Sequence, residues 1–134
     1  LGIIAALYWA FKLRTSAPEA ISLQRSIDLS RADIVDVVDA FERFRDSGDA
    51  EAIADRTLQR PELNNPNSTD PDIESFYIQL ATARRFLQRL DIHLMSASTT
   101  EELESLLAIT DKRAFELNQS WIKARRAAVR FKRG

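Results

Sequence analysis

The side chains that most often carry catalysis or metal binding are scattered along this sequence rather than gathered in a motif. His93 is the only histidine, so no second imidazole stands at the spacing of a helical metal site. Asp33, Asp36 and Asp39 recur every third residue, which spreads them over the polar side of a helix. The Glu-x-x-His motif of di-iron bundles does not occur. We therefore expect neither a catalytic site nor a metal or other cofactor.

The charges of the chain are divided between its two halves. Residues 15–74 contain 14 acidic and 6 basic side chains (net −8), and residues 75–134 contain 6 acidic and 11 basic ones (net +5). Lys12 and Arg14 add the remaining +2, which brings the total to −1. Two halves of opposite sign can attract each other within one fold, or each can meet an oppositely charged partner. The chain has no cysteine, which excludes disulfides, thiolate metal sites and cysteine nucleophiles.

The C-terminal residues 123–134 form a basic segment without any acidic side chain. Its six cations are Lys123, Arg125, Arg126, Arg130, Lys132 and Arg133. A basic amphipathic helix end can bind an anionic lipid surface or an acidic protein, hold nucleic acid phosphates, or offset the negative end of its own helix dipole. Nucleic acid is disfavoured as the partner, because the rest of the surface is acidic and no recognition motif is present.

A second candidate surface is an apolar stripe on the same predicted helix. Phe115, Ile122 and Val129 are spaced seven residues apart, beside the seam that contains Trp121. We expect Trp121 to lie in the core, since aromatic residues at helical spacing usually fill a bundle. If the neighbouring stripe is exposed, it is a docking surface for a helix of another protein.

The apolar periodicity predicts an all-α protein, an antiparallel helical bundle of three long helices plus one short helix. The long helices are expected at residues 18–47, 71–95 and 100–131, and the short one at residues 49–60. Apolar residues beside the seam of the second long helix predict a wide buried stripe. These residues are Tyr77, Ile78, Phe86, Ile92 and Met95.

Capping and turn residues predict where these helices begin and end. Asp70 before Pro71 predicts the start of one helix, and Thr99 with Glu102 predicts a capping box at the start of the next. Gly48 is expected to end the first long helix. Asp49 is expected to cap the short one, and residues 61–72 to form the one long loop. Ser30 leaves open whether the first long helix is kinked or broken there.

The first residues of the chain differ from all of these helices. Residues 1–11 are apolar on every side of a helix and lack the polar face of a surface helix. Eleven residues rise only about 16 Å, against a hydrocarbon core of about 30 Å, so by themselves they are too short to cross a membrane. Tyr8 and Trp9, followed by Lys12 and Arg14, match an interfacial aromatic belt with cations beyond it.

These features predict that residues 1–14 are the end of a single transmembrane helix and that residues 15–134 form a helical domain in the cytoplasm. Thr15, Ser16 and Pro18 are expected to break the chain between the two parts. A buried core helix and the remnant of a signal peptide are the alternatives for the apolar segment.

The pattern favours a non-catalytic, membrane-anchored scaffold or accessory subunit whose helical domain packs against a larger membrane protein complex. The first alternative is a soluble regulatory bundle that binds an anionic partner through its basic C-terminal helix. A second alternative is a small-molecule binding bundle, or an enzyme whose site lies between the helices, since Ser30 and Thr110 put polar groups at seam positions.

Overall fold

The computed structural model describes the backbone of residues 2–134 and the side chains of residues 17–134. Every regular element in this range is helical. The elements are α1 (Gly2–Asp46), α2 (Ala50–Ala54), the π-helical turn η1 (Asp55–Gln59), the 3-10 turn η2 (Pro61–Asn64), α3 (Pro71–Ser96) and α4 (Thr100–Arg133). The predicted all-α bundle of three long helices and a short one is therefore confirmed.

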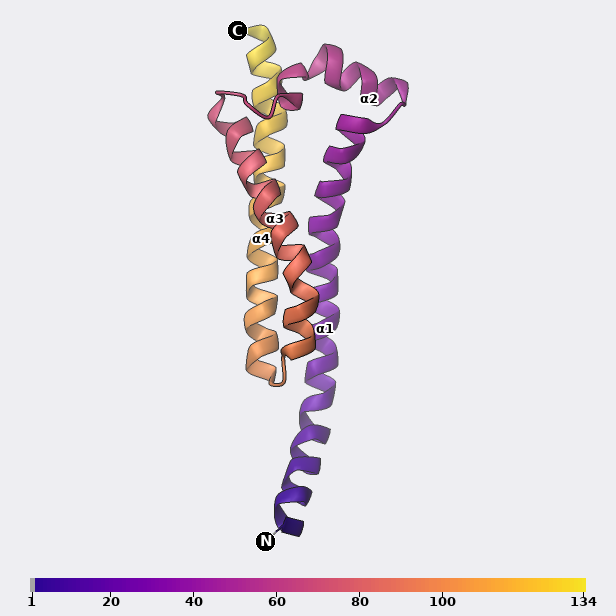
Figure 1. Ribbon diagram of the computed structural model, residues 1–134, viewed down its shortest axis with the longest axis vertical. Helices are drawn as coiled ribbons and strands as arrows, with labels where there is room; N and C mark the ends of the chain where they lie inside the picture. Colours follow the sequence, from indigo (N-terminus) through magenta and orange to yellow (C-terminus); the bar gives the residue numbers. More distant parts are fainter. Residues whose placement is uncertain (1) are drawn as a thin grey trace.

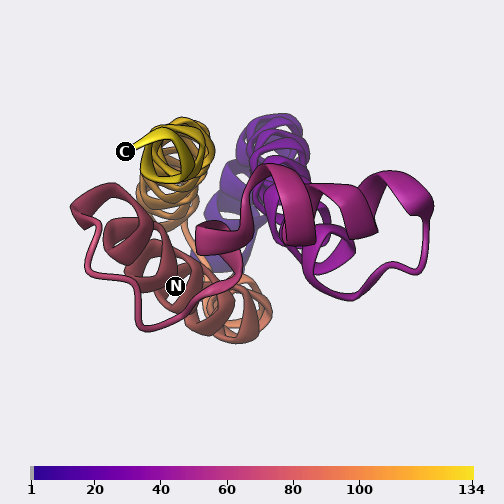
Figure 2. The same cartoon turned by 90° about the horizontal axis from the view of Figure 1, so that it is seen from above.

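The three long helices run up, down and up (Figure 1). α1 and α4 consequently point in the same direction, and α3 runs antiparallel to both. Seen along the bundle axis, the three helices occupy the corners of a triangle, and α2 extends sideways beyond α1 (Figure 2). This arrangement gives each long helix two neighbours.

The predicted starts of α3 and α4 are confirmed in detail. The Asp70 carboxylate accepts hydrogen bonds from the amides of Asp72 (2.9 Å) and Ile73 (3.2 Å). The Thr99 hydroxyl accepts one from the amide of Glu102 (3.1 Å), and the Glu102 carboxylate accepts one from the amide of Ser98 (3.0 Å). These bonds pair amides that the first turn of a helix leaves without partners.

The end of α1 and the start of α2 differ from the prediction. Gly48 does not adopt the left-handed conformation of a helix-ending glycine. The guanidinium of Arg56 instead donates to the carbonyls of Ser47 (2.6 Å) and Phe44 (3.4 Å), which takes up free acceptors at the end of α1. The Asp49 side chain makes no capping bond, although its backbone precedes α2 as expected.

The break predicted at Thr15–Pro18 is wrong, because α1 continues through Pro18 as one helix. A proline removes one backbone hydrogen bond, but its fixed φ of about −65° is a helical value, so the helix can continue. α1 does not break at Ser30 either. The Ser30 hydroxyl donates to the carboxylate of Asp111 in α4 and caps no new helix.

The core forms along the apolar faces of the three long helices. Residues from all three long helices are fully buried in it, among them Ile34, Phe41, Ile73, Phe76 and Leu117. A smaller cluster of Ile27, Leu90 and Leu103 closes the end nearest the turn between α3 and α4. Leu63 is also fully buried, so the segment predicted as an open loop contributes a core residue through η2.

The stripe on α3 is narrower than predicted. Ile78, Ile92 and Met95 are 58%, 66% and 87% exposed, whereas Tyr77 and Phe86 are partly buried against the core. A helix with only two neighbours buries a limited part of its surface, so these three side chains face outward.

Tyr77 links the core to η2 and gives stability a dependence on pH. Its hydroxyl donates to the carbonyl of Leu63 (2.7 Å). Burial raises the pKa of the Tyr77 phenol above its usual value, although nearby Arg45 opposes the shift. The folded state therefore holds this proton more tightly than the unfolded chain, whose phenol titrates near pH 10.

We predict that the free energy of unfolding falls as pH rises above about 10, and that part of this fall is absent in Tyr77→Phe. At neutral pH, Tyr77→Phe should cost about 0.5–1.5 kcal/mol for the lost hydrogen bond. Urea unfolding of both proteins at pH 8 and pH 10.5 measures the difference. An equally steep decline in both proteins would contradict the role given to Tyr77.

The N-terminal part of α1 extends past the turn between α3 and α4, beyond the body of the bundle (Figure 1). Ala20 and Leu23 are the first described residues of α1 that pack against the other helices. Within the described part of the chain, no helix combines the length and apolar character needed to cross a bilayer. The predicted interface side chains of Tyr8, Trp9, Lys12 and Arg14 lie outside the described side chains.

Candidate functional site

A groove runs between α1 and α4, and no residue of α3 lines it. We call it the outer groove. Its volume is about 640 Å³, and all of its lining residues belong to α1 or α4. They are Ser30, Asp33, Asp36, Val37, Ala40, Asp111, Ala114, Phe115, Asn118 and Trp121.

The outer groove combines carboxylates with an exposed aromatic ring. Asp33, Asp36 and Asp111 are exposed, and Asp111 accepts the hydrogen bond from Ser30 that joins the two helices. Phe115 is 67% exposed, which is unusual for a phenylalanine. A contiguous apolar patch rimmed by charge is typical of a protein-docking surface, and Phe115 begins the apolar stripe that Ile122 and Val129 continue.

A second hollow, of about 570 Å³, continues along α4 toward its C-terminus. We call it the arginine groove. It is lined by Arg60, Trp121, Ile122, Arg125, Arg126, Val129, Arg130 and Arg133. Trp121 lines both hollows, so they meet at this residue.

Three of the five arginines in the arginine groove are partly neutralised by carboxylates of the chain. Asp55 in η1 binds the guanidinium groups of Arg60 (2.7 Å) and Arg125 (3.4 Å). Asp72 pairs with Arg130 at 3.2 Å. The Arg125 guanidinium also stacks over the Trp121 ring, 5.1 Å from its centroid, a cation–π contact that holds both side chains in place.

The remaining two, Arg126 and Arg133, are exposed and make no ion pair with any residue among 17–134. They are therefore the positive charges in this groove that are most available to an anionic group. Ile122 and Val129 lie between the arginines as a half-buried apolar floor.

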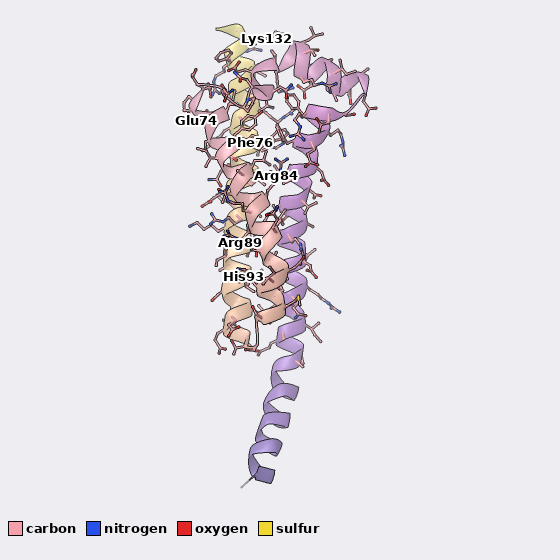
Figure 3. The ribbon with its side chains drawn as sticks, in the orientation of Figure 1. Glu74, Phe76, Arg84, Arg89, His93 and Lys132 are labelled. Atoms are coloured by element: carbon pink, nitrogen blue, oxygen red, sulfur yellow. The ribbon has the colours of Figure 1, made fainter. Side chains whose placement is uncertain are left out.

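The structure divides the six predicted anion-binding cations between different surfaces. Arg125, Arg126, Arg130 and Arg133 line the arginine groove together. Lys123 faces a separate hollow toward α3, beside Asp72 and Glu116. Lys132 lies at the top of the molecule and donates to the carbonyl of Leu58 (Figure 3).

The predicted apolar stripe is divided in the same way. Phe115 lines the outer groove and also the hollow toward α3, whereas Ile122 and Val129 line the arginine groove. The two parts remain continuous because Trp121 borders both. Trp121 itself is half-buried and packs on Phe41 and Phe76, as the seam position predicts.

Arg60, like Asp111 of the outer groove, is a site residue that sequence reasoning did not identify. It lies at the end of a short irregular segment, more than sixty positions before the other four arginines. The one notable feature of Arg60 in the sequence is that Pro61 follows it, and this indicates the end of a helix rather than a binding site. The fold brings it to α4 because η1 and η2 pack beside the C-terminal end of that helix.

The other residues that were considered for chemistry lie elsewhere. His93 is exposed near the lower end of α3, far from Lys132 (Figure 3). Thr110 is fully buried and donates to the carbonyl of Leu106 (2.6 Å), so it does not line a cavity with Ser30. Among residues 17–134, no cluster of three histidine, aspartate or glutamate side chains is arranged to hold a metal ion.

The arrangement is suited to binding a helix or an extended acidic segment through apolar contact and charge. Comparison with known proteins adds no relative to this picture, because no protein family, curated protein or solved structure matches the chain.

Proposed function

We propose that this protein is a non-catalytic scaffold subunit that holds a helix of a partner protein in the outer groove. The observation that carries the proposal is the apolar stripe of Phe115, Ile122 and Val129 on α4, which borders the groove between the parallel helices α1 and α4. Two adjacent helices leave a groove between them, and the side-chain ridges of a further helix can pack into it, as in a four-helix bundle. The partner would cover the apolar ring, and the surrounding charges would select its orientation.

We further propose that the N-terminal segment of α1 is the end of a single transmembrane helix and that the bundle lies in the cytoplasm. The apolar residues 1–11, the aromatic pair Tyr8 and Trp9 and the cations Lys12 and Arg14 support this assignment. The unbroken course of α1 would then make the bundle a rigid extension of the membrane helix. Asp33 would stand about 28 Å beyond Arg14 along the helix axis. The partner would accordingly belong to a larger membrane protein complex.

The distance between the proposed membrane helix and the basic C-terminus helps to choose among the possible anionic partners of that C-terminus. Arg126 and Arg133 lie about 40–50 Å along α4 from its first turn, the end from which the N-terminal part of α1 extends. An anchored chain would keep these arginines far beyond the Debye length of about 8–10 Å from its own bilayer. We therefore favour an acidic protein segment over anionic lipid for this groove, with nucleic acid still disfavoured.

Site-specific photo-crosslinking tests the docking proposal. A benzophenone amino acid in place of Phe115, in the full chain in its native cells, should give one discrete adduct with a partner protein. The matched control is the same amino acid in place of Ile92, which is equally exposed on α3. Equal adducts at both positions, or none at Phe115, would show that the outer groove is not a docking site.

Membrane extraction tests the anchor separately. The full chain should stay with the membrane pellet in alkaline carbonate and enter solution only with detergent. Ile3→Arg combined with Ile4→Arg should weaken this retention, because these residues lie on the lipid side of Tyr8 and Trp9, and an arginine costs up to about 2.5–3.5 kcal/mol as it approaches the centre of a membrane helix. Release of the unaltered chain by carbonate alone would refute the anchor and leave the docking proposal standing.

A further inference from the structure

The outer groove and the arginine groove form one surface whose charge changes sign along its length. Asp33, Asp36 and Asp111 stand at one end, and Arg126 and Arg133 at the other. The rise along α4 from Asp111 to Arg133 is about 33 Å, several times the Debye length of about 8–10 Å. Each end therefore acts on its own part of a bound molecule.

An apolar line joins the two charged ends. Phe115, Ile122 and Val129 follow one another at heptad spacing, and half-buried Trp121 lies where the two hollows meet. A heptad stripe of this kind fits the apolar seam of a further helix. A partner helix of about 22 residues would reach from Asp111 to Arg133, beyond both ends of this line.

We propose that this surface binds an amphipathic helix of a partner protein that carries carboxylates in its N-terminal half and cations in its C-terminal half. Such a helix runs antiparallel to α4, with its carboxylates over the arginines and its cations over the aspartates. This direction also sets its dipole against the parallel dipoles of α1 and α4, and it places each charge at the helix end that favours it. The inference rests on the proposed function, because it specifies the partner of the same site.

Four synthetic helical peptides of about 24 residues test this inference. They share one leucine stripe and differ only in charge: acidic N-terminal half with basic C-terminal half, the reverse order, all acidic, and all basic. Fluorescence anisotropy with the full chain in detergent measures their affinity at about 0.15 M salt. The first peptide should bind at least tenfold more tightly than either uniform peptide.

The direction of binding is read by disulfide trapping, which is clean because the chain has no cysteine. With Val129→Cys at the arginine end, a cysteine at the N-terminus of the first peptide should form a disulfide, and one at its C-terminus should not. The reversed peptide should give the opposite result, since its carboxylates are at its C-terminus.

Exchange of the charges should exchange the direction. The variant Asp33→Lys, Asp36→Lys, Arg126→Glu and Arg133→Glu changes only exposed side chains and should reverse both trapping results. Arg85→Glu with Arg89→Glu on α3 is the matched control and should change neither direction nor affinity. The inference would be overturned if the peptides bound the charge-exchange variant in the same direction as the parent chain. It would also be overturned if the all-acidic peptide bound most tightly.

Two further results distinguish a failure of this inference from a failure of the proposed function. A concentration-dependent dimer of the chain that competes with the peptides would assign the groove to a second copy and overturn the proposed partner. A discrete adduct at Phe115 in cells, combined with failure of all four peptides, would refute the charge pattern while the docking proposal stands.

Discussion

Phe76→Ala is expected to lower the free energy of unfolding by about 3–5 kcal/mol, because it removes a fully buried ring from the centre of the bundle. The Phe76 ring meets Phe41 edge-on with centroids 5.3 Å apart, and it lies 5.1 Å from Trp121 and 5.8 Å from Tyr77. Aromatic pairs add about 0.5–1.5 kcal/mol beyond the area they bury. Figure 3 shows Phe76 on α3 among the three long helices.

Urea unfolding followed by circular dichroism measures this loss. Phe115→Ala is the matched control, because it removes the same ring from an exposed position on α4. Surface substitutions usually change stability by no more than about 0.5 kcal/mol, so the control should remain near the parent value. If the two variants were equally destabilised, the aromatic cluster would not be the centre of the core.

Asp55→Asn is expected to lower stability and to strengthen anion binding at the same time. The Asp55 carboxylate is 17% exposed and binds both Arg60 and Arg125, so its loss leaves two guanidinium groups without their charge partner. The Arg60 Nε atom is already buried without a hydrogen-bond partner, so the loss of the Asp55 carboxylate would leave this guanidinium with still fewer partners. Hydrogen bonds to charged groups contribute about 1.5–3 kcal/mol, and partial exposure reduces this, so we expect a loss of about 1–3 kcal/mol.

The same change raises the positive charge of the arginine groove, so an all-acidic helical peptide should bind several-fold more tightly. The gain should shrink as salt is added, because counterions screen exposed charges. Asp49→Asn is the control: Asp49 is exposed, makes no capping bond, and should change stability by no more than about 0.5 kcal/mol. Unchanged peptide affinity in Asp55→Asn would mean that Arg60 and Arg125 do not face the bound anion.

Much of the secondary structure follows from the sequence, because its determinants are local. The spacing of apolar residues three and four apart defines which face of a helix is buried, and the buried residues Ile34, Phe76 and Leu117 follow this spacing. Asp70 and Thr99 cap their helices because a short polar side chain reaches the amides two or three residues ahead. These interactions require no knowledge of the rest of the chain.

Local sequence patterns left the outcome open, or indicated the wrong residue, where a residue outside the local pattern formed the hydrogen bond instead. Ser30 bonds to Asp111 rather than capping a helix, and Arg56 takes the place that Gly48 was expected to fill at the end of α1. The partners involved are separated by up to 81 positions. No rule based on neighbouring residues anticipates such a bond.

By itself the sequence determined the helices, their seams, the division of charge between the two halves and the existence of an apolar stripe on α4. Only the tertiary structure decided that α1 and α4 run parallel with one shared side left open, that Phe115 is exposed there, and that Arg60 joins the arginines of α4. Periodicity records which side of each helix is apolar, whereas the number of neighbours and their directions depend on how three helices fill a common core. That packing decides which apolar and charged groups remain open to a partner.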